Sequence, residues 1–426
     1  MEIRPAPLVL AVALILTVPL PSPAQTAGRP SPQAEVQAAT QPPAQAQAPS
    51  AAETSPQGAR SAISLGGMIA GVAMTRLDKA VAPFFSLRAI PELKFTLPAG
   101  RGWTLDGEAS ASAYGALIFP PGSSAETDGD IKPYRAWLRL STARFEARAG
   151  LQKISFGSAT LFRPLMWFDS LDPRDPLQLT DGVYALLLRY YTPGNANFWA
   201  WGLIANDDRR GFDLAPPDDR TPEFGGRAQL PLFKGEIAAT YHHRKADIAY
   251  LVPIMDPAAP IPIPPVPEDR FGLDGKWDIG VGLSFEAALV HQRTPFLFTP
   301  YQRAYTVGLD YTFGIGHGLT AVAEHFRIAS SERAFSRPLS PEAGLSFTGL
   351  VLRYPLGLRD EISGIFFYDW DRRDAYRFIS WKRTTDALTL SAVVYWNPAE
   401  LLVFQGLPGS GTLAGTGLEL VLAYYF

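Results

Sequence analysis

Polar and apolar residues alternate with a period of two along most of this chain, and such alternation predicts β-strands. In the stretch RFEARAGLQ, residues 144–152, charged and amide side chains alternate with Phe, Ala and Leu. The stretch QRAYTVGLDYTF, residues 302–313, places Tyr, Val, Leu and Phe opposite Thr, Gly and Asp. Similar stretches recur roughly every 20 residues from residue 61 onward. Strands with one apolar and one polar face suit a sheet that separates lipid from water.

The connections between these stretches alternate in length. Short connections fall at residues 98–102, 142–144, 193–197, 232–235, 278–281, 313–318, 356–360 and 384–386, and long ones at residues 76–84, 120–130, 155–181, 207–221, 246–268, 292–301, 330–343, 371–374 and 398–412. Turns at one rim and loops at the other are typical of outer-membrane barrels. We therefore predict an all-β fold, a transmembrane antiparallel up-and-down β-barrel of about 18 strands. Because residues 371–386 are ambiguous, 16 strands is the alternative.

The amino-terminal part of the chain has a different pattern. Arg4 precedes an apolar run over residues 8–20, and Ser22 and Ala24 suit a signal peptidase. The run is too short to cross a membrane as a helix, so residues 1–24 are predicted to be a signal peptide, with an uncleaved anchor as the alternative. Residues 25–60 are mostly Ala, Pro and Gln, which predicts a disordered periplasmic leader. The barrel is then expected to occupy residues 61–426.

Composition narrows the classes of function. The chain has no Cys, which excludes disulfides, a thiol nucleophile and thiolate metal sites. It has 38 Lys and Arg against 41 Asp and Glu, so no basic excess indicates a nucleic-acid partner. The sequence contains no G-x-S-x-G and no H-E-x-x-H motif, which argues against an enzyme. No cofactor and no metal are therefore expected.

The carboxyl-terminal stretch AGTGLELVLAYYF, residues 414–426, has apolar side chains on alternate positions and ends on an aromatic residue. Tyr424 stands at the third position from the end and Phe426 at the last. This arrangement resembles the final-strand signal of Gram-negative outer-membrane barrels. The resemblance implies recognition by the barrel-assembly machinery, and it implies an outer membrane of lipid and lipopolysaccharide as the protein's surroundings.

Charged residues on the inward face are candidates to line a pore, because a barrel of this size is too wide for wall side chains alone to fill. These candidates are Arg88, Glu92, Arg135, Arg139, Arg144, Glu146, Arg148, Arg189 and Arg227. Five of these arginines fall on three consecutive predicted strands, where Glu146 is the one acidic neighbour, and such a row would attract anions. The alternative is that opposite charges pair and stiffen the wall.

The third long loop, residues 155–182, is too apolar to extend into solvent. It contains LFRPLMWF followed by two Asp-Pro turns, which suits an ordered loop packed on the inner wall. In position and length it resembles the third loop of porins, and GLQ at 150–152 with Phe156 and Gly157 resembles porin-like bacterial outer-membrane families of unassigned substrate. The resemblance implies a constriction formed by Phe162, Trp167, Asp172, Arg174 and Asp175. Calcium binding by Asp169, Asp172, Asp175 and Asp181 is an alternative to simple turn formation.

These observations favour a porin or channel for passive diffusion of small hydrophilic solutes, with anions as one expected class. The alternatives are an outer-membrane enzyme built like a lipase barrel and a transporter of hydrophobic substrates. The predicted charged lumen and polar leader argue against the transporter. A homotrimer is one expected assembly and a monomer the other. The Pro-rich segment 250–267 is predicted to be either a binding element or a stiff extension.

Overall fold

The computed structural model describes residues 62–78, 83–120, 122–249, 263–294, 297, 299–335, 344–398 and 413–426. The predicted signal peptide and leader lie outside the described residues, as does most of the Pro-rich segment. Within the described part of the chain, no helix is both long and apolar enough to cross a membrane.

Eighteen antiparallel strands form one sheet, in the order in which they occur along the chain. Their bounds are β1 Ala62–Arg76, β2 Phe84–Gly100, β3 Trp103–Ile118, β4 Glu126–Ser141, β5 Phe145–Gln152, β6 Val183–Tyr191, β7 Asn197–Leu203, β8 Glu223–Leu232, β9 Gly235–Ala246, β10 Val266–Asp278, β11 Gly282–Gln292, β12 Tyr301–Phe313, β13 Leu319–Ser331, β14 Gly344–Pro355, β15 Asp360–Asp369, β16 Asp374–Thr384, β17 Leu388–Trp396 and β18 Thr416–Tyr425. The predicted fold class and the count of 18 are confirmed.

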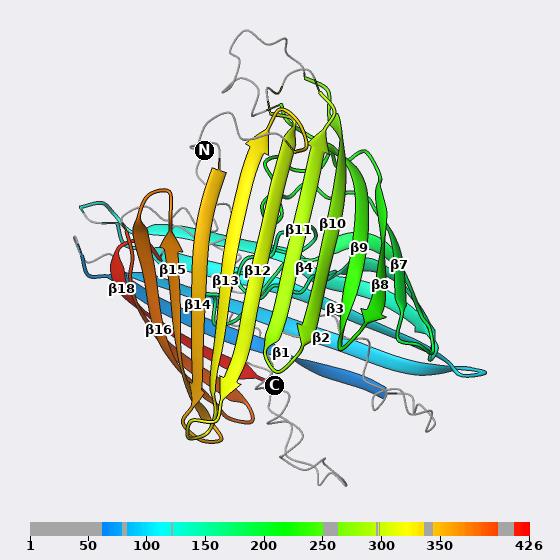
Figure 1. Cartoon of the computed structure of the whole chain (residues 1–426). Helices are drawn as coiled ribbons and strands as arrows, with labels where there is room; N and C mark the ends of the chain where they lie inside the picture. Colours follow the sequence, from blue (N-terminus) through cyan, green and yellow to red (C-terminus); the bar gives the residue numbers. More distant parts are fainter. Residues whose placement is uncertain are drawn as a thin grey trace.

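The sheet closes on itself because β1 pairs with both β2 and β18 (Figure 1). The closing register runs from Met68 opposite Tyr425 to Arg76 opposite Gly417. The last residue completes this seam, since Phe426 and Gly67 exchange two backbone hydrogen bonds of 3.1 Å. Closure leaves no unpaired sheet edge, which is the condition for a sheet to exist in lipid.

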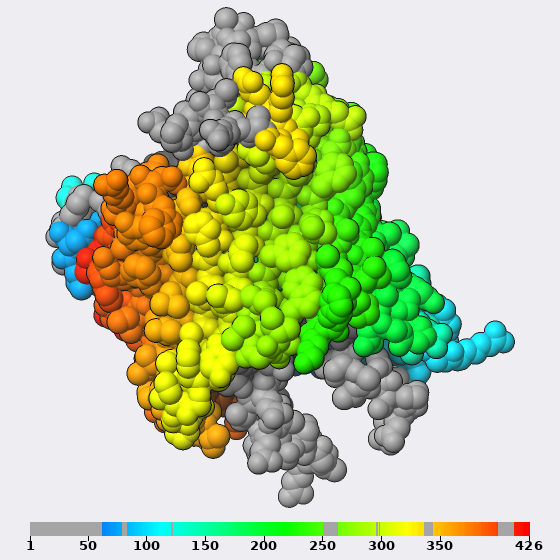
Figure 2. Space-filling model, viewed as in Figure 1, coloured from blue at the N-terminus to red at the C-terminus, as the bar shows by residue number. Residues whose placement is uncertain are grey.

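The alternation along each strand places one set of side chains on the outside of the barrel and the other set on the inside. On β12, Tyr305, Val307 and Leu309 are exposed, whereas Thr306 between them is fully buried. The same division applies round the barrel, so the outward residues are largely apolar. Figure 2 shows one face of this outer wall, coloured along the sequence. An apolar outer belt around a closed sheet is what a membrane-spanning barrel requires.

The two rims differ as predicted. One rim carries short turns, such as the one between Leu232 and Gly235, and the other carries long connections, such as residues 153–182 between β5 and β6. The start of β1 and the end of β18 lie at the short-turn rim. In outer-membrane barrels the short turns face the periplasm and the long loops face outward, so we call the two ends the inner and outer rims.

Candidate functional site

The third loop, residues 153–182, crosses the lumen and packs against the opposite wall. The ring of Phe162 stacks on that of Phe326 at 5.2 Å and on that of Phe347 at 6.0 Å, and it meets the ring of Phe367 edge-on at 5.3 Å. These three partners point inward from β13, β14 and β15, about halfway round the barrel from β5. Phe162 is fully buried and Trp167 is nearly so. The apolar content of the loop therefore fills the barrel with a hydrophobic core.

Two wall carboxylates hold the backbone of this loop. Glu324 on β13 accepts hydrogen bonds from the amides of Thr160, Leu161 and Phe162, at 2.6, 2.8 and 3.0 Å. Glu286 on β11 accepts from the amides of Ala159 at 2.7 Å and Leu165 at 3.1 Å. Both side chains are almost completely buried, and a buried amide donor that lost its acceptor would be left unsatisfied at a cost. The loop is fixed at its tip as well as at its ends.

Two glycines allow this path. Gly150 on β5 has φ of +118°, and a Cβ there would overlap the carbonyl of Ala136. Gly157 has φ of +107°, and a Cβ there would overlap the carboxylate of Glu286. Only glycine adopts such backbone angles without strain, so these positions shape the exit from β5 and the close approach to Glu286.

The fourth loop, residues 204–222, also folds inward, which was not foreseen from the sequence. Phe212 stacks on Phe326 at 4.9 Å, so the third and fourth loops share one aromatic partner. Asp213 binds the guanidinium groups of Arg244 at 2.9 Å and Arg270 at 2.7 Å. All three charged side chains are buried. The signal in the sequence was one Phe and one Leu flanking an Asp, which is too weak to predict a buried loop.

The space that remains is a cavity of about 1090 Å³ between the wall and the two loops. Its lining includes residues of β1, β2, β3, β4 and β18, together with residues 168–182 and 205–210 of the loops. Arg88 lies on the wall side, where it donates to Ser112 Oγ at 3.0 Å and stacks over the Tyr114 ring at 4.7 Å. Glu419 of β18 also lines the cavity.

The loop presents three of its predicted residues to this cavity. Asp172 and Arg174 form an ion pair of 2.6 Å, and the carboxylate of Asp175 accepts from the amides of Leu177 and Leu179. Burial raises the pKa of Asp175, although these two amides oppose the rise. Phe162 and Trp167, which were predicted with them, belong to the packed core and do not line the cavity.

The chain is similar to solved structures of other proteins, but its sequence matches no known family. No family model matches the chain, and no curated protein matches it. OccAB1 of Acinetobacter baumannii is 10% identical over 85% of this chain and 96% of its own, with a TM-score of 0.52. OccK5 (OpdH) of Pseudomonas aeruginosa is 12% identical over 85% and 98%, with a TM-score of 0.51. The outer membrane channel DcaP of Acinetobacter baumannii is 11% identical over 86% and 97%, with a TM-score of 0.46.

The chain has the fold of bacterial outer-membrane porins. At this level of identity the likeness concerns the fold alone.

The predicted arginine row is largely paired. Arg139 binds Asp106 at 2.9 Å, Arg148 binds Glu146 at 2.8 Å, and Arg189 lies 3.7 Å from the same Glu146 carboxylate. Three guanidinium groups thus share two carboxylates in the inner half of the porin-like barrel. This is the arrangement expected if opposite charges pair to stiffen the wall.

The other candidate lining residues have separate places. Arg135 is buried and donates to the carbonyl of Thr180 at 2.8 Å, so it holds the end of the third loop. Arg227 is buried against Asp274 on β10, with a bond of 2.8 Å. Glu92 pairs with Lys94 on the same strand at 2.8 Å. Arg144 lies in the exposed turn between β4 and β5 and is not part of the row.

The aspartates considered for calcium each have another partner. Asp181 binds Lys132 at 2.6 Å and Asp169 binds Arg163 at 3.1 Å, while Asp172 and Asp175 have the partners given above. Among the described residues, no group of three or more His, Asp or Glu side chains is arranged to hold a metal ion. Asp172 and Asp175 accept nearby backbone amides as turn-forming residues do, whereas Asp169 and Asp181 form ion pairs.

Glu286 and Glu324 were missed by sequence reasoning, although they matter most for the path of the third loop. Each is a lone acid on an inward face that is otherwise small or apolar: Glu286 lies between Ser284 and Ala288. An isolated acid on such a face is a usable signal of a buried partner, because burying an unpaired carboxylate is costly. The identity of that partner, a backbone segment about 160 residues away in the case of Glu324, is not in the local pattern.

Proposed function

We propose that this protein is an outer-membrane channel through which small hydrophilic solutes diffuse passively. The observation that carries the proposal is the cavity of about 1090 Å³ left between the partly charged wall of β1–β4 and β18 and the two inward loops. The apolar interior against β13–β15 is filled by side chains of the two loops, such as Phe162 and Phe212. It therefore leaves no apolar passage for a hydrophobic substrate. We propose no catalysis.

The third loop is proposed to set the narrowest part of the route. Its carboxylates Asp172 and Asp175 share the cavity with Arg88 of the wall, so a passing solute meets charged groups on both sides. Because Glu286 and Glu324 fix the tip of the loop, the opening keeps a defined size. A fixed opening with polar edges excludes solutes by size and hydration rather than by tight binding.

Charge selection is proposed to be weak, because two regions oppose each other. In the inner half, three guanidinium groups share two carboxylates, which favours anions. The cavity lining instead contains more carboxylates than basic side chains, which favours cations. The anion preference expected from the arginine row stays a prediction, and the same measurement tests it.

The test is the conductance of the refolded full chain in a planar lipid bilayer. We expect stable open-channel current in simple salt and a reversal potential near zero under a salt gradient. Asp175→Asn should shift the reversal potential toward anions, and Arg139→Glu should shift it toward cations. Absence of current from protein that is shown to be folded would contradict the channel, and cleavage of lipid by that protein would favour the enzyme instead.

A further inference from the structure

Glu419 is a carboxylate on the inner wall that has no partner among the described residues. It lies on β18, between Met74 of β1 and Val393 of β17, and these two neighbours are buried and apolar. Within the described ranges its carboxylate forms no ion pair and no hydrogen bond, and the side chain lines the cavity described above. An acidic group on an apolar part of the wall therefore faces the lumen without a partner.

Two other lone acids on the wall show what such a position implies. Glu286 and Glu324 also lie on inward faces, and each accepts amide hydrogen bonds from the third loop. Burying a carboxyl group without a hydrogen-bond partner is costly, so both positions are explained by the loop. Glu419 receives no loop amide. Its partner is therefore to be sought among the solutes that enter the cavity.

The charged side chains that act on Glu419 come from the third loop and are Asp172, Arg174 and Asp175. Arg174 donates to both carboxylate oxygens of Asp172, at 2.8 and 2.6 Å, so these two charges offset each other. Asp175 accepts two amides, and its other basic neighbour is Arg88 on β2. When all three carboxylates are ionised, they outnumber the two guanidinium groups by one. The group therefore has room for one further positive charge.

A buried carboxylate oxygen of the same cavity is also unsatisfied. Asp169 lines the cavity, and its side chain is 1% exposed. Its Oδ2 accepts from Arg163, whereas its Oδ1 has no hydrogen-bond partner in the described part of the chain. Buried polar atoms in proteins nearly always have such a partner. Like Glu419, this oxygen indicates a hydrogen-bond donor that the described residues do not supply.

The lining beside Glu419 suits an apolar body. Met74 lies next to Glu419, and Phe84 lies next to Met74 on β2. Both line the cavity, as does Leu413. A metal ion would make no use of these side chains, and among the described residues no three His, Asp or Glu side chains are arranged to hold one. An organic cation uses both parts, because its N–H groups bind carboxylates while its hydrocarbon covers the apolar lining.

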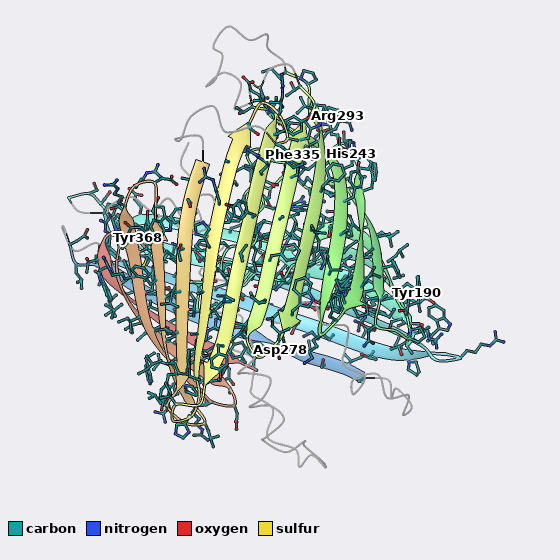
Figure 3. The ribbon with its side chains drawn as sticks, viewed as in Figure 1. Tyr190, His243, Asp278, Arg293, Phe335 and Tyr368 are labelled. Carbon is teal, nitrogen blue, oxygen red and sulfur yellow. The ribbon has the colours of Figure 1, made fainter. Side chains whose placement is uncertain are left out.

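The position of Glu419 is in the outer half of the barrel. It lies opposite Met74, and β1 ends two residues further on, at Arg76. In Figure 3, His243 and Arg293 mark the outer rim and Asp278 marks the inner rim. A solute that enters from outside therefore reaches Glu419 before it reaches the inner half of the barrel.

From the unpartnered carboxylate, the charge count and the apolar lining we propose that the cavity holds a binding subsite for small organic cations, meaning ammonium or guanidinium compounds with an apolar body. This subsite rests on the channel proposed above and names its solute class. The cation donates charge-assisted hydrogen bonds to Glu419, and its positive charge favours the ionised form of that carboxyl group. A neutral compound lacks the charged donor, and an anion is repelled.

The experiment titrates the full folded protein in detergent with benzylammonium at mildly alkaline pH and follows binding by saturation-transfer NMR of the ligand. Benzyl alcohol and benzoate are the matched probes, because they carry the same ring with a neutral or a negative group. We expect benzylammonium to bind and the other two to bind about tenfold more weakly, since neither offers a charged N–H donor.

The variants test the role of the carboxylate. Glu419→Gln should bind benzylammonium about tenfold more weakly, because a neutral amide replaces the carboxylate. Glu419→Asp keeps the charge and should retain most of the affinity. Glu236→Gln is the matched control: Glu236 also faces inward, but it accepts from Gln229 at 2.7 Å and does not line the cavity. It should bind like the unaltered protein.

Equal binding of benzylammonium and benzoate to the unaltered protein would overturn the subsite. Undiminished binding by a Glu419→Gln variant that keeps its strand content by circular dichroism would also overturn it. Current through a planar bilayer separates the subsite from the channel. Brief interruptions by benzylammonium that are absent in Glu419→Gln would support both. Binding in detergent without any current would contradict the channel and leave the subsite, whereas steady current with no binding would overturn the subsite and leave the channel.

Discussion

Replacing Glu324 by Gln tests whether one buried carboxylate fixes the third loop. The carboxylate accepts three amide hydrogen bonds, at 2.6, 2.8 and 3.0 Å, and Glu324 is 1% exposed. Hydrogen bonds to charged groups contribute ~1.5–3 kcal/mol each. Gln keeps one carbonyl oxygen, but it turns an NH₂ group toward the amide donors on the other side, which leaves those buried donors unsatisfied at ~1–3 kcal/mol each. We therefore expect the variant to hold the loop tip less tightly by about 2–4 kcal/mol.

The assay is hydrogen exchange of the folded protein in lipid nanodiscs, followed by mass spectrometry of the peptide that spans residues 159–166. The hydrogen bonds between the strands of the barrel remain. The weaker hold on the third loop therefore appears as local opening of that loop and not as global unfolding of the barrel. A weakening of 2–4 kcal/mol corresponds to roughly 30- to 1,000-fold faster exchange at Thr160, Leu161 and Phe162. Peptides from β3, which has no contact with the loop tip among the described residues, should exchange as before.

Glu92→Gln is the matched control. Glu92 also faces the lumen, but its partner is Lys94 on the same strand and it does not touch the loop. Its replacement should leave exchange in residues 159–166 unchanged. Less than threefold acceleration in Glu324→Gln, with the control unaffected, would refute the view that this carboxylate anchors the loop.

Three further outcomes follow from particular contacts. Gly157→Ala should accelerate exchange in the same peptide because the new Cβ overlaps the Glu286 carboxylate, whereas Gly194→Ala, with open space around it, should not. Arg227→Ala should lower stability by about 3–5 kcal/mol in urea titrations by leaving Asp274 buried and unpaired, and Arg227→Met with Asp274→Leu should recover most of it. Deletion of Phe426 removes two hydrogen bonds to Gly67 and should reduce the folded yield in cells; an unchanged yield would contradict the role given to the last residue.

The strands could be predicted from the sequence because their signal is local. On β12 every second residue from Tyr305 to Phe313 is apolar or aromatic, and each of those residues faces outward. The inward fold of the third loop was also predictable, since Phe162 and Trp167 could not remain in solvent. What covers these rings was not predictable, because their partners Phe326 and Phe347 are more than 150 residues away along the chain.

The residues of the candidate site were likewise predictable only in part. Asp172, Arg174 and Asp175 reached the cavity because turn chemistry placed them at the loop surface. Arg144 is out of the row because β4 ends at Ser141 and β5 begins at Phe145, which places Arg144 in the turn between them. Such strand boundaries are the least certain part of a sequence-based assignment. Arg227 on β8 pairs with Asp274 on β10, across the intervening strand β9. Alternation along one strand carries no information about which residues on other strands come within reach.

The seam between Gly67 and Phe426 has a consequence for assembly. Bringing such distant residues together costs roughly 5 kcal/mol in loop-closure entropy, and no contact nearer in sequence can substitute for it. Until the last residues are in place, β1 and β18 each present an open edge to whatever surrounds the chain. Neighbouring strands can pair in the order in which they are made, but the β1–β18 seam forms last, so these two edges stay unpaired until β18 is in place.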